Sequence, residues 1–295
     1  MKKGLLYALG AYGLWGLFPI YWKFVKHVPA LQVIGHRIVW SFVLLFIVIL
    51  ATDQWTRLRS LLTRRVLAVY LLTGLLLSVN WLIYVWGVNA GYIVETSLGY
   101  FINPLISVLL GVFFLRERLR PVQWLPLGLA AAGVLYLTFT YGRLPWIAIS
   151  LAFSFGLYGL VKKLAPLGSL HGLTLETGMV FAPAVAYLLF AEIQGDGHFL
   201  RDGLATDLFL IGAGLVTTVP LLMFASAVQR IPLTMVGLMQ YIAPTIQFLI
   251  GVLVYKEPFD QARLIGFGMV WVALVIFWVE GFWAHRSQAV TVPAD

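Results

Sequence analysis

One stretch of the chain places a carboxylate, an amide and a hydroxyl within an otherwise apolar sequence. Glu95, Gly99, Asn103, Ser107 and Gly111 recur every four residues and therefore share one stripe of a helix. An unpaired polar group facing hydrocarbon costs several kcal/mol, so we expect this stripe to face other helices or a watery cavity. A carboxylate there could bind a proton, and the amide could recognise a small solute.

Two adjacent ionisable residues, His36 and Arg37, lie about as far inside their apolar segment as Glu95 lies inside its own. Equal depth allows an ion pair between Arg37 and Glu95. Three interpretations remain open for this pair: a buried structural pair, a substrate or gate contact, or a proton-coupling site. His36 could serve as a hydrogen-bonding partner or as a proton relay, because imidazole changes charge near neutral pH.

Amides and aromatic rings deep in other apolar segments could line a substrate cavity. Aromatic rings suit an apolar substrate, and amides would supply a few polar contacts, although the same amides could simply join helices. The candidates are Trp15, Asn80, Trp81, Tyr84, Tyr100, Asn103, Tyr158, Gln240 and Tyr241.

Two acidic residues that follow apolar segments, Glu117 and Glu257, are either solvated helix ends or latches of a gate. We expect no metal site and no cofactor, because the chain has no cysteine and its histidines are scattered.

The composition requires a membrane. Of 295 residues, 61% are hydrophobic and 11% are charged, and the mean hydropathy is +0.92, which exceeds what a water-soluble core of this length could bury. The net charge is +8, and the basic residues that produce it lie between the apolar segments, so they indicate topology and not nucleic-acid binding. Segments of about 20 apolar residues predict an all-α protein with ten spans: 4–23, 31–51, 66–88, 92–115, 121–141, 145–164, 170–192, 207–228, 232–255 and 261–283.

Lysine and arginine are more frequent on the side of the N-terminus than on the opposite side. We therefore expect both termini in the cytoplasm and a multi-pass protein of the plasma (inner) membrane. A last segment, 286–295, is expected to be a disordered cytoplasmic tail.

The two halves of the chain resemble each other at an offset of 140 residues. The matched residues include Lys23 and Lys163, Gly74 and Gly214, Pro104 and Pro244, and Glu117 and Glu257. This predicts two repeats, 1–141 and 142–285, and five spans per repeat would insert the second upside down relative to the first. Inverted repeats are typical of secondary transporters with a site near the middle of the membrane.

The remaining motifs are the segments 13–23, 36–41, 80–81 and 95–105, with weaker ones at 240–244 and 256–258. Together they resemble the RarD-like permeases of the EamA family, in the drug/metabolite transporter superfamily. The resemblance implies ten helices in two inverted five-helix repeats, with spans 1, 3, 4, 6, 8 and 9 around a central cavity. It also implies a chloramphenicol-type or related small-molecule permease.

The favoured function is a secondary transporter that exports a small organic metabolite or drug by alternating access. Its partners would be this substrate, the bilayer and a proton or counter-substrate, and it would act as a monomer or homodimer. An intramembrane enzyme would need a nucleophile and base or metal ligands, and the sequence has no HExxH motif and no phosphate-binding loop. A channel is the third class, although no filter motif is present.

Overall fold

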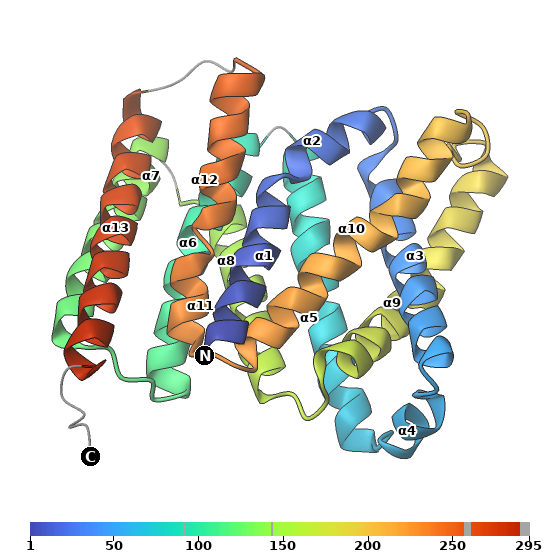
Figure 1. The fold of residues 1–295 in the computed structure, drawn as a ribbon. Helices are drawn as coiled ribbons and strands as arrows, with labels where there is room; N and C mark the ends of the chain where they lie inside the picture. Colours follow the sequence, from blue (N-terminus) through green and yellow to red (C-terminus); the bar gives the residue numbers. More distant parts are fainter. Residues whose placement is uncertain (91, 143, 257–260, 290–295) are drawn as a thin grey trace.

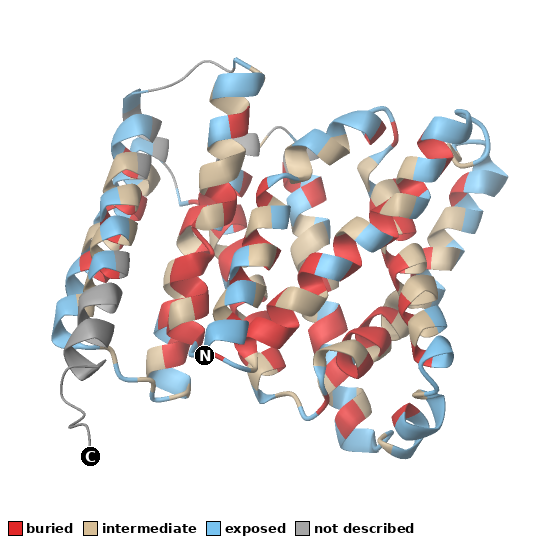
Figure 2. Ribbon diagram, in the orientation of Figure 1, coloured by how far each residue is buried: buried red, intermediate tan, exposed pale blue. Residues whose placement is uncertain are grey.

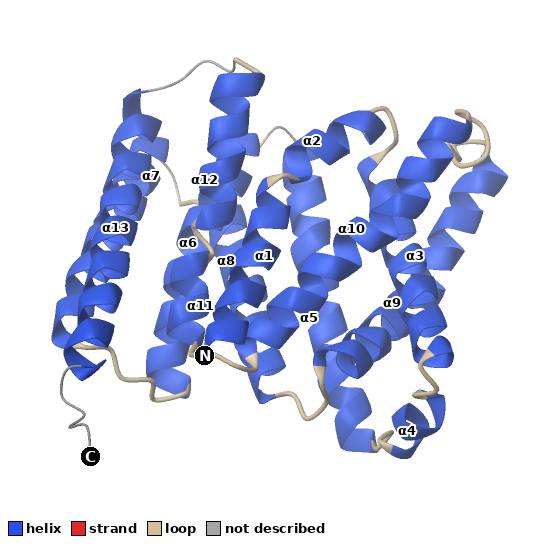
Figure 3. Cartoon of the chain, in the orientation of Figure 1, coloured by secondary structure: helices blue, strands red, loops and turns tan. Residues whose placement is uncertain are grey.

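Every regular element that the structure describes is a helix (Figure 3). The structure is a computed structural model that describes residues 1–90, 92–142, 144–256 and 261–289. Within these residues, nine helical segments are long and apolar enough to cross a membrane, and a tenth helix contains a shorter apolar stretch, Leu264–Phe277. The prediction of an all-α membrane protein is confirmed.

The helices follow the predicted spans closely. In chain order they are α1 Lys2–Gly16, α2 Phe18–Trp22, α3 Ala30–Ala51, α4 Trp55–Ser60, α5 Arg64–Asn89, α6 Ile93–Phe114, α7 Trp124–Tyr141, α8 Trp146–Leu164, α9 Ser169–Gln194, α10 Leu204–Val228, α11 Leu233–Met239, α12 Ile242–Leu249 and α13 Gln261–Ala289. A π-helical turn, Ile250–Val254, extends α12. Residues 286–289 of the expected tail continue α13, and the rest of that tail lies outside the described residues.

Two predicted spans are divided, and a proline follows each division. Pro19 has no N–H to bond the carbonyl of Trp15, and the Nε2 of Gln247 donates to that carbonyl instead, at 3.0 Å. Pro244 likewise cannot bond the carbonyl of Gln240, which lies between α11 and α12. The structure therefore leaves irregular backbone within the first and ninth spans. Neighbouring helices cover it at Gln240 and Tyr241, whereas Leu17 is 48% exposed.

The bundle has a central group of helices with a helix pair at each side (Figure 1). Helices α7 and α13 pack together at one side, and α3 packs on α9 at the other. Buried residues concentrate on the central helices (Figure 2). The largest buried cluster joins α1, α8, α10 and α11 and includes Tyr12, Tyr158, Phe224, Ile231 and Leu233.

Glycine lets the central helices approach closely at two places. A Cβ on Gly237 would lie 2.8 Å from the carbonyl oxygen of Pro104, and one on Gly99 would lie 3.2 Å from that of Ala148. Helix α6 can therefore contact both α11 and α8 at backbone distance, as small residues allow in membrane bundles. These contacts position Tyr100 and Asn103 of α6 beside the other two helices.

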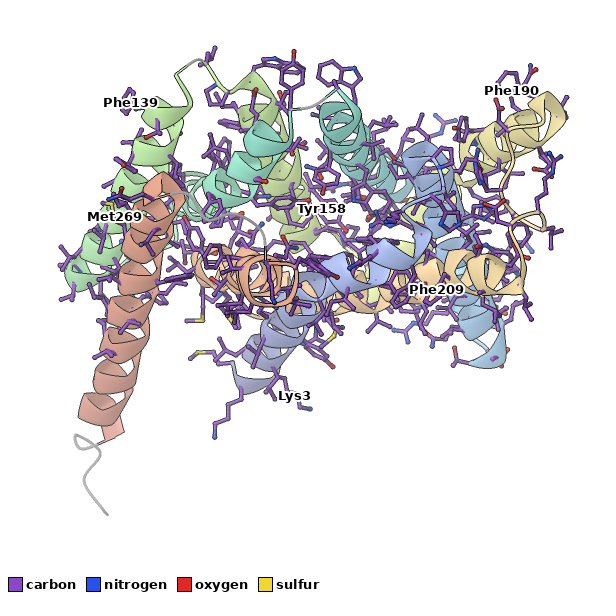
Figure 4. The ribbon with its side chains drawn as sticks, turned by 90° about the horizontal axis from the view of Figure 1, so that it is seen from above. Lys3, Phe139, Tyr158, Phe190, Phe209 and Met269 are labelled. Atoms are coloured by element: carbon purple, nitrogen blue, oxygen red, sulfur yellow. The ribbon has the colours of Figure 1, made fainter. Side chains whose placement is uncertain are left out.

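Large apolar side chains cover the outside of the bundle. Phe139 is 79% exposed and Phe190 is 58% exposed, and they lie at opposite sides of the molecule with Tyr158 between them (Figure 4). Such a surface would be unfavourable in water, but it matches a hydrocarbon environment.

Candidate functional site

A cavity of about 330 Å³ lies between the central helices. Helices α1 and α5 contribute residues from their C-terminal halves, such as Trp15 and Tyr84, whereas α6 and α8 contribute residues from their N-terminal halves, such as Tyr100 and Leu151. Because successive spans run in opposite directions, these halves lie at one end of the bundle. We call it the distal half, and the half in which α1 begins is the proximal half.

The proximal half is closed by the largest buried cluster. Tyr158 and Phe224 stack there with ring centroids 5.8 Å apart and an interplanar angle of 12°, and Ile231 and Leu233 are each 1% exposed. The cavity therefore extends through only part of the bundle, and side chains fill the remainder.

Seven of the nine predicted cavity residues line this cavity. They are Trp15, Asn80, Trp81, Tyr84, Tyr100, Asn103 and Gln240. Their shared location agrees with the expected cavity, and their contact with a substrate stays a prediction.

The other two candidates, Tyr158 and Tyr241, do not line the cavity. Tyr158 is fully buried in the proximal cluster. Tyr241 is 1% exposed, and its hydroxyl donates to the carbonyl of Phe101 at 3.1 Å. Each residue lies on a span that borders the cavity. Tyr241 points to another face of its helix than the adjacent Gln240, whereas Tyr158 lies on the same face of α8 as Leu151 and Phe155 but is covered by the proximal cluster.

Polar side chains join helices at the deep end of the cavity. The hydroxyl of Ser107 lies 3.4 Å from Oδ1 of Asn103 and 3.5 Å from Oε1 of Gln240. Among the described residues, neither the Nδ2 of Asn103 nor the Nε2 of Gln240 donates a hydrogen bond within the protein. Asn80 differs, because its Nδ2 donates at 2.9 Å both to the Leu151 carbonyl and to Ser154.

Arg37 is the charged residue of the cavity lining. Its Nε donates to the hydroxyl of Thr217 on α10 at 2.9 Å. The guanidinium carbon lies 4.2 Å from the ring centroid of Trp81 and 5.0 Å from that of Trp22. These contacts stabilise the cation partly through the negative faces of two indole rings.

The possible ion pair between Arg37 and Glu95 does not occur: no described carboxylate oxygen lies within 4.0 Å of the Arg37 guanidinium. Glu95 instead accepts a hydrogen bond from the backbone N–H of Ile147 at 2.7 Å. That N–H lies in the first turn of α8, where helix geometry leaves donors unpaired and favours a negative charge. Equal depth did not imply that the two side chains face each other.

His36 is buried and does not line the cavity. Its Nδ1 lies 3.3 Å from the Nε1 of Trp40, and its ring centroid is 4.9 Å from that of Phe199. It therefore packs beside the loop that precedes α10, consistent with a role as a hydrogen-bonding partner.

Glu117, a gate candidate, connects two helix ends in the proximal half. Its carboxylate accepts from the backbone N–H groups of Leu233 and Thr234, at 2.7 and 2.8 Å, in the first turn of α11. Lys163 lies 3.9 Å from the same carboxylate and donates to the carbonyl of Ile231 at 2.7 Å. The end of α6 is thus tied to the start of α11. The other gate candidate, Glu257, lies outside the described residues.

The sequence interpretation missed a buried ion pair in the proximal half. Lys162 on α8 and Glu176 on α9 lie 2.6 Å apart, and each side chain is 2% exposed. The ring centroids of Tyr70 and Tyr158 lie 5.4 and 5.7 Å from the Lys162 ammonium. Glu176 within the apolar segment 170–192 was the available signal, since intramembrane carboxylates generally have a buried partner.

The described residues form apolar helices around a cavity that is lined by amides, tyrosines and one guanidinium. This is the organisation of a small-solute transporter. The sequence profile described as the EamA-like transporter family matches residues 2–139 and 144–279. The chain belongs to this family, and the resemblance inferred from its motifs is confirmed.

Curated relatives from several bacteria match over nearly the full length. The uncharacterized transporter YojE of Bacillus subtilis (strain 168) is 47% identical over 98% of this chain and 98% of its own length. Protein RarD of Escherichia coli (strain K12) is 40% identical over 98% of both chains. A Pseudomonas aeruginosa relative named chloramphenicol-sensitive protein RarD is 29% identical over 97% of both.

The fold also resembles a solved structure. One crystal structure aligns with a TM-score of 0.71 at 17% identity and covers 94% of this chain and 96% of its own. At this identity the similarity concerns the fold alone.

Proposed function

We propose that this protein is a secondary transporter of the inner membrane that exports a small organic molecule by alternating access. The observation that carries the proposal is the cavity that reaches from the distal half only as far as the Asn103–Gln240 level, with the proximal half packed shut. Such a cavity is available from one end of the bundle at a time, as a carrier requires and an open channel does not.

Equivalent helix pairs support the inverted repeat, because contacts between two helices recur between the helices that correspond to them in the other half. Helix α1 packs on α10 as α8 packs on α5, and α6 packs on α8 as α12 packs on α1. At the residue level, a Cβ on Gly74 would lie 3.6 Å from Val180, and one on Gly214 would lie 2.5 Å from Trp40. These two contacts are related by the offset of 140 residues. The proposed halves are 1–141 and 142–285, and the family profile matches once in each.

The same offset relates the cavity to the closed half. Phe18 and Tyr84 line the cavity, and their counterparts 140 residues later are Tyr158 and Phe224, which stack on each other in the proximal cluster. An exchange of conformations between the two repeats would separate the second pair and bring the first together. The proximal half would then contain the cavity.

The proposed topology places both termini in the cytoplasm, where the flanking Lys and Arg residues are more frequent. Helix α1 begins and α13 ends at the same end of the bundle (Figure 1). On this assignment the distal cavity faces the outside. The name of one relative refers to chloramphenicol sensitivity, and chloramphenicol is therefore a compound to test and not an assigned substrate.

Cysteine accessibility tests the mechanism without any knowledge of the substrate, because the chain has no native cysteine. Tyr84→Cys places a thiol on the cavity, whereas Gly159→Cys places one in the proximal cluster, where a Cβ would meet Phe224 at 3.4 Å. We expect a membrane-impermeant thiol reagent to label Tyr84→Cys from outside. The same reagent should label Gly159→Cys only from the cytoplasmic side, and only in the minor fraction of molecules whose proximal half is open.

Conditions that raise the labelling of Gly159→Cys should lower that of Tyr84→Cys, since one exchange governs both. If both thiols stay inert in every condition, or both react from both sides at once, the protein is not an alternating-access carrier with this cavity.

A further inference from the structure

The charge of the cavity is unbalanced. Its lining contains aromatic rings, amides and hydroxyls together with the guanidinium of Arg37, and it contains no carboxylate among the described residues. The acidic side chain that sequence depth had suggested as a partner, Glu95, accepts from the backbone of α8. A cation at membrane depth without a fixed counter-charge is unfavourable, so it is normally neutralised by something that binds to it.

The known contacts of Arg37 leave most of its donors available. A guanidinium has five N–H donors in a planar fork. One of them, on Nε, is used by Thr217, and the aromatic contacts with Trp81 and Trp22 use the face of the group and not its N–H bonds. The Nε contact and the two rings hold the fork in one orientation, which prepares it for a planar anion.

The rest of the cavity suits an apolar body of limited size. Trp15 and Phe155 line it with ring centroids 5.9 Å apart, and the free amide donors of Asn103 and Gln240 lie at its deep end. A volume of about 330 Å³ is at the small end of ligand cavities. An ammonium group would meet the like charge of Arg37 and find no carboxylate in the described lining.

We propose that Arg37 is the anion-recognition residue of the substrate site and that the substrate is a small organic monocarboxylate with an aromatic or branched apolar body. The carboxylate would bind the fork of Arg37, with the apolar body between Trp15, Trp81 and Phe155. This inference rests on the proposed transport function and specifies the substrate class. It distinguishes a monocarboxylate substrate from cations, amino acids and neutral drugs.

A charge series of one molecular shape tests this in the unmodified, full-length protein. The probes are 3-phenylpropionate, its neutral amide 3-phenylpropanamide and the cation 3-phenylpropan-1-amine, with chloramphenicol as a second neutral compound. Binding to purified protein in lipid nanodiscs is measured by calorimetry and by the shift in melting temperature. We expect the carboxylate to bind at least about tenfold more tightly than the other three, because charge-assisted, bidentate hydrogen bonds form only with the anion.

Variants then assign the selectivity to Arg37. Arg37→Gln should remove the preference for the carboxylate over the amide, and Arg37→Lys should retain part of it, since an ammonium keeps the charge but loses the fork. The charge-matched control is Arg201→Gln. Arg201 is an exposed residue of the loop before α10, and it pairs with Glu192 at the end of α9. This variant should bind all four probes as the unmodified protein does. If Arg37→Gln fails to fold, Thr217→Val provides a milder change, which should weaken carboxylate binding and leave amide binding unaffected.

Several results would overturn the proposal. They are equal or tighter binding of the amide, the amine or chloramphenicol, no binding of the carboxylate, or a carboxylate preference that survives in Arg37→Gln. None of these concerns the transport mechanism, because the cysteine accessibility experiment uses no ligand. A purely structural Arg37 would lower the melting temperature when replaced without changing the ratio of carboxylate to amide affinity.

Discussion

At the scale of single residues, Lys162 and Arg37, two cations within the membrane spans, have different environments. Lys162 has a carboxylate, Glu176, at 2.6 Å and is almost fully buried, whereas Arg37 faces a cavity and has a hydroxyl and two indole rings as its neighbours. A closed ion pair satisfies itself and holds helices together. A cation with available donors at a cavity is suited to bind a ligand.

The Lys162–Glu176 pair should be sensitive to the loss of one partner. Glu176→Gln would leave the Lys162 ammonium buried without a counter-charge, and we expect a loss of about 3 to 5 kcal/mol in the free energy of unfolding. Replacing both residues together, with Lys162→Met and Glu176→Leu, should restore most of that stability. Thermal unfolding in detergent is the measurement.

Glu192→Gln is the matched control for this prediction. It breaks an exposed pair in which Arg201 lies 3.1 Å away and both side chains are more than 40% exposed. Solvent screens such pairs, so the expected change is below about 1 kcal/mol. Equal effects of Glu176→Gln and Glu192→Gln would show that the buried pair does not contribute in the way we describe.

At the scale of helices, the two divided spans both border the cavity. The first span changes direction at Leu17, and the ninth is broken at Gln240 and Tyr241. The first turn of α11, in the proximal half, donates to the carboxylate of Glu117, three residues after the end of α6. Because α11 is short and its first turn is capped by a side chain from the other repeat, its start is a natural point of separation when the proximal half opens.

Glu117→Ala should therefore favour the inward-open conformation. The substitution removes the acceptor of two N–H groups, and losing such a cap costs about 0.5 to 2 kcal/mol. Since 1.4 kcal/mol corresponds to a tenfold change in an equilibrium, labelling of Gly159→Cys from the cytoplasmic side should rise by about two- to thirtyfold. The control is Arg118→Ala, an exposed neighbour. Unchanged labelling with a lower melting temperature would assign Glu117 a structural role only.

At the scale of the whole molecule, the helix pairing relates the distal and proximal halves of the bundle. Tyr241 and Phe101 are separated by 140 residues and are joined by a hydrogen bond, so residues that correspond in the two halves meet each other at the centre of the molecule. A contact between corresponding positions is what an approximate twofold axis in the membrane plane would produce. Such an axis would not itself say which end of the bundle faces the outside, and the charge distribution predicts that the proximal end is cytoplasmic.

Labelling at the two ends of the bundle tests the orientation. Gln194 and Ser60 are both exposed, the first at the end of α9 and the second at the end of α4. A cysteine at Gln194 should react with an impermeant reagent in intact cells, and one at Ser60 should react only after permeabilisation. The reverse pattern would place the termini outside and make the distal cavity cytoplasmic.

The sequence alone determined the membrane-spanning helices and the depth of most cavity residues. Apolar runs of about 20 residues must form helices in lipid, because every backbone N–H and C=O then bonds within its own segment. Position along a span gives depth directly, and depth was sufficient to select Asn80, Tyr84, Tyr100, Asn103 and Gln240 as cavity residues.

Only the tertiary structure decided which face of each helix meets which neighbour. Successive residues turn by about 100° around a helix, so Tyr241 faces Phe101 while the adjacent Gln240 lines the cavity. Arg37 and Glu95 have the same depth but point to Thr217 and to Ile147. The pairing of Lys162 with Glu176 depends on the rotation and packing of two helices, and a single sequence carries little information about rotation because nearly all of its spans are apolar on every side.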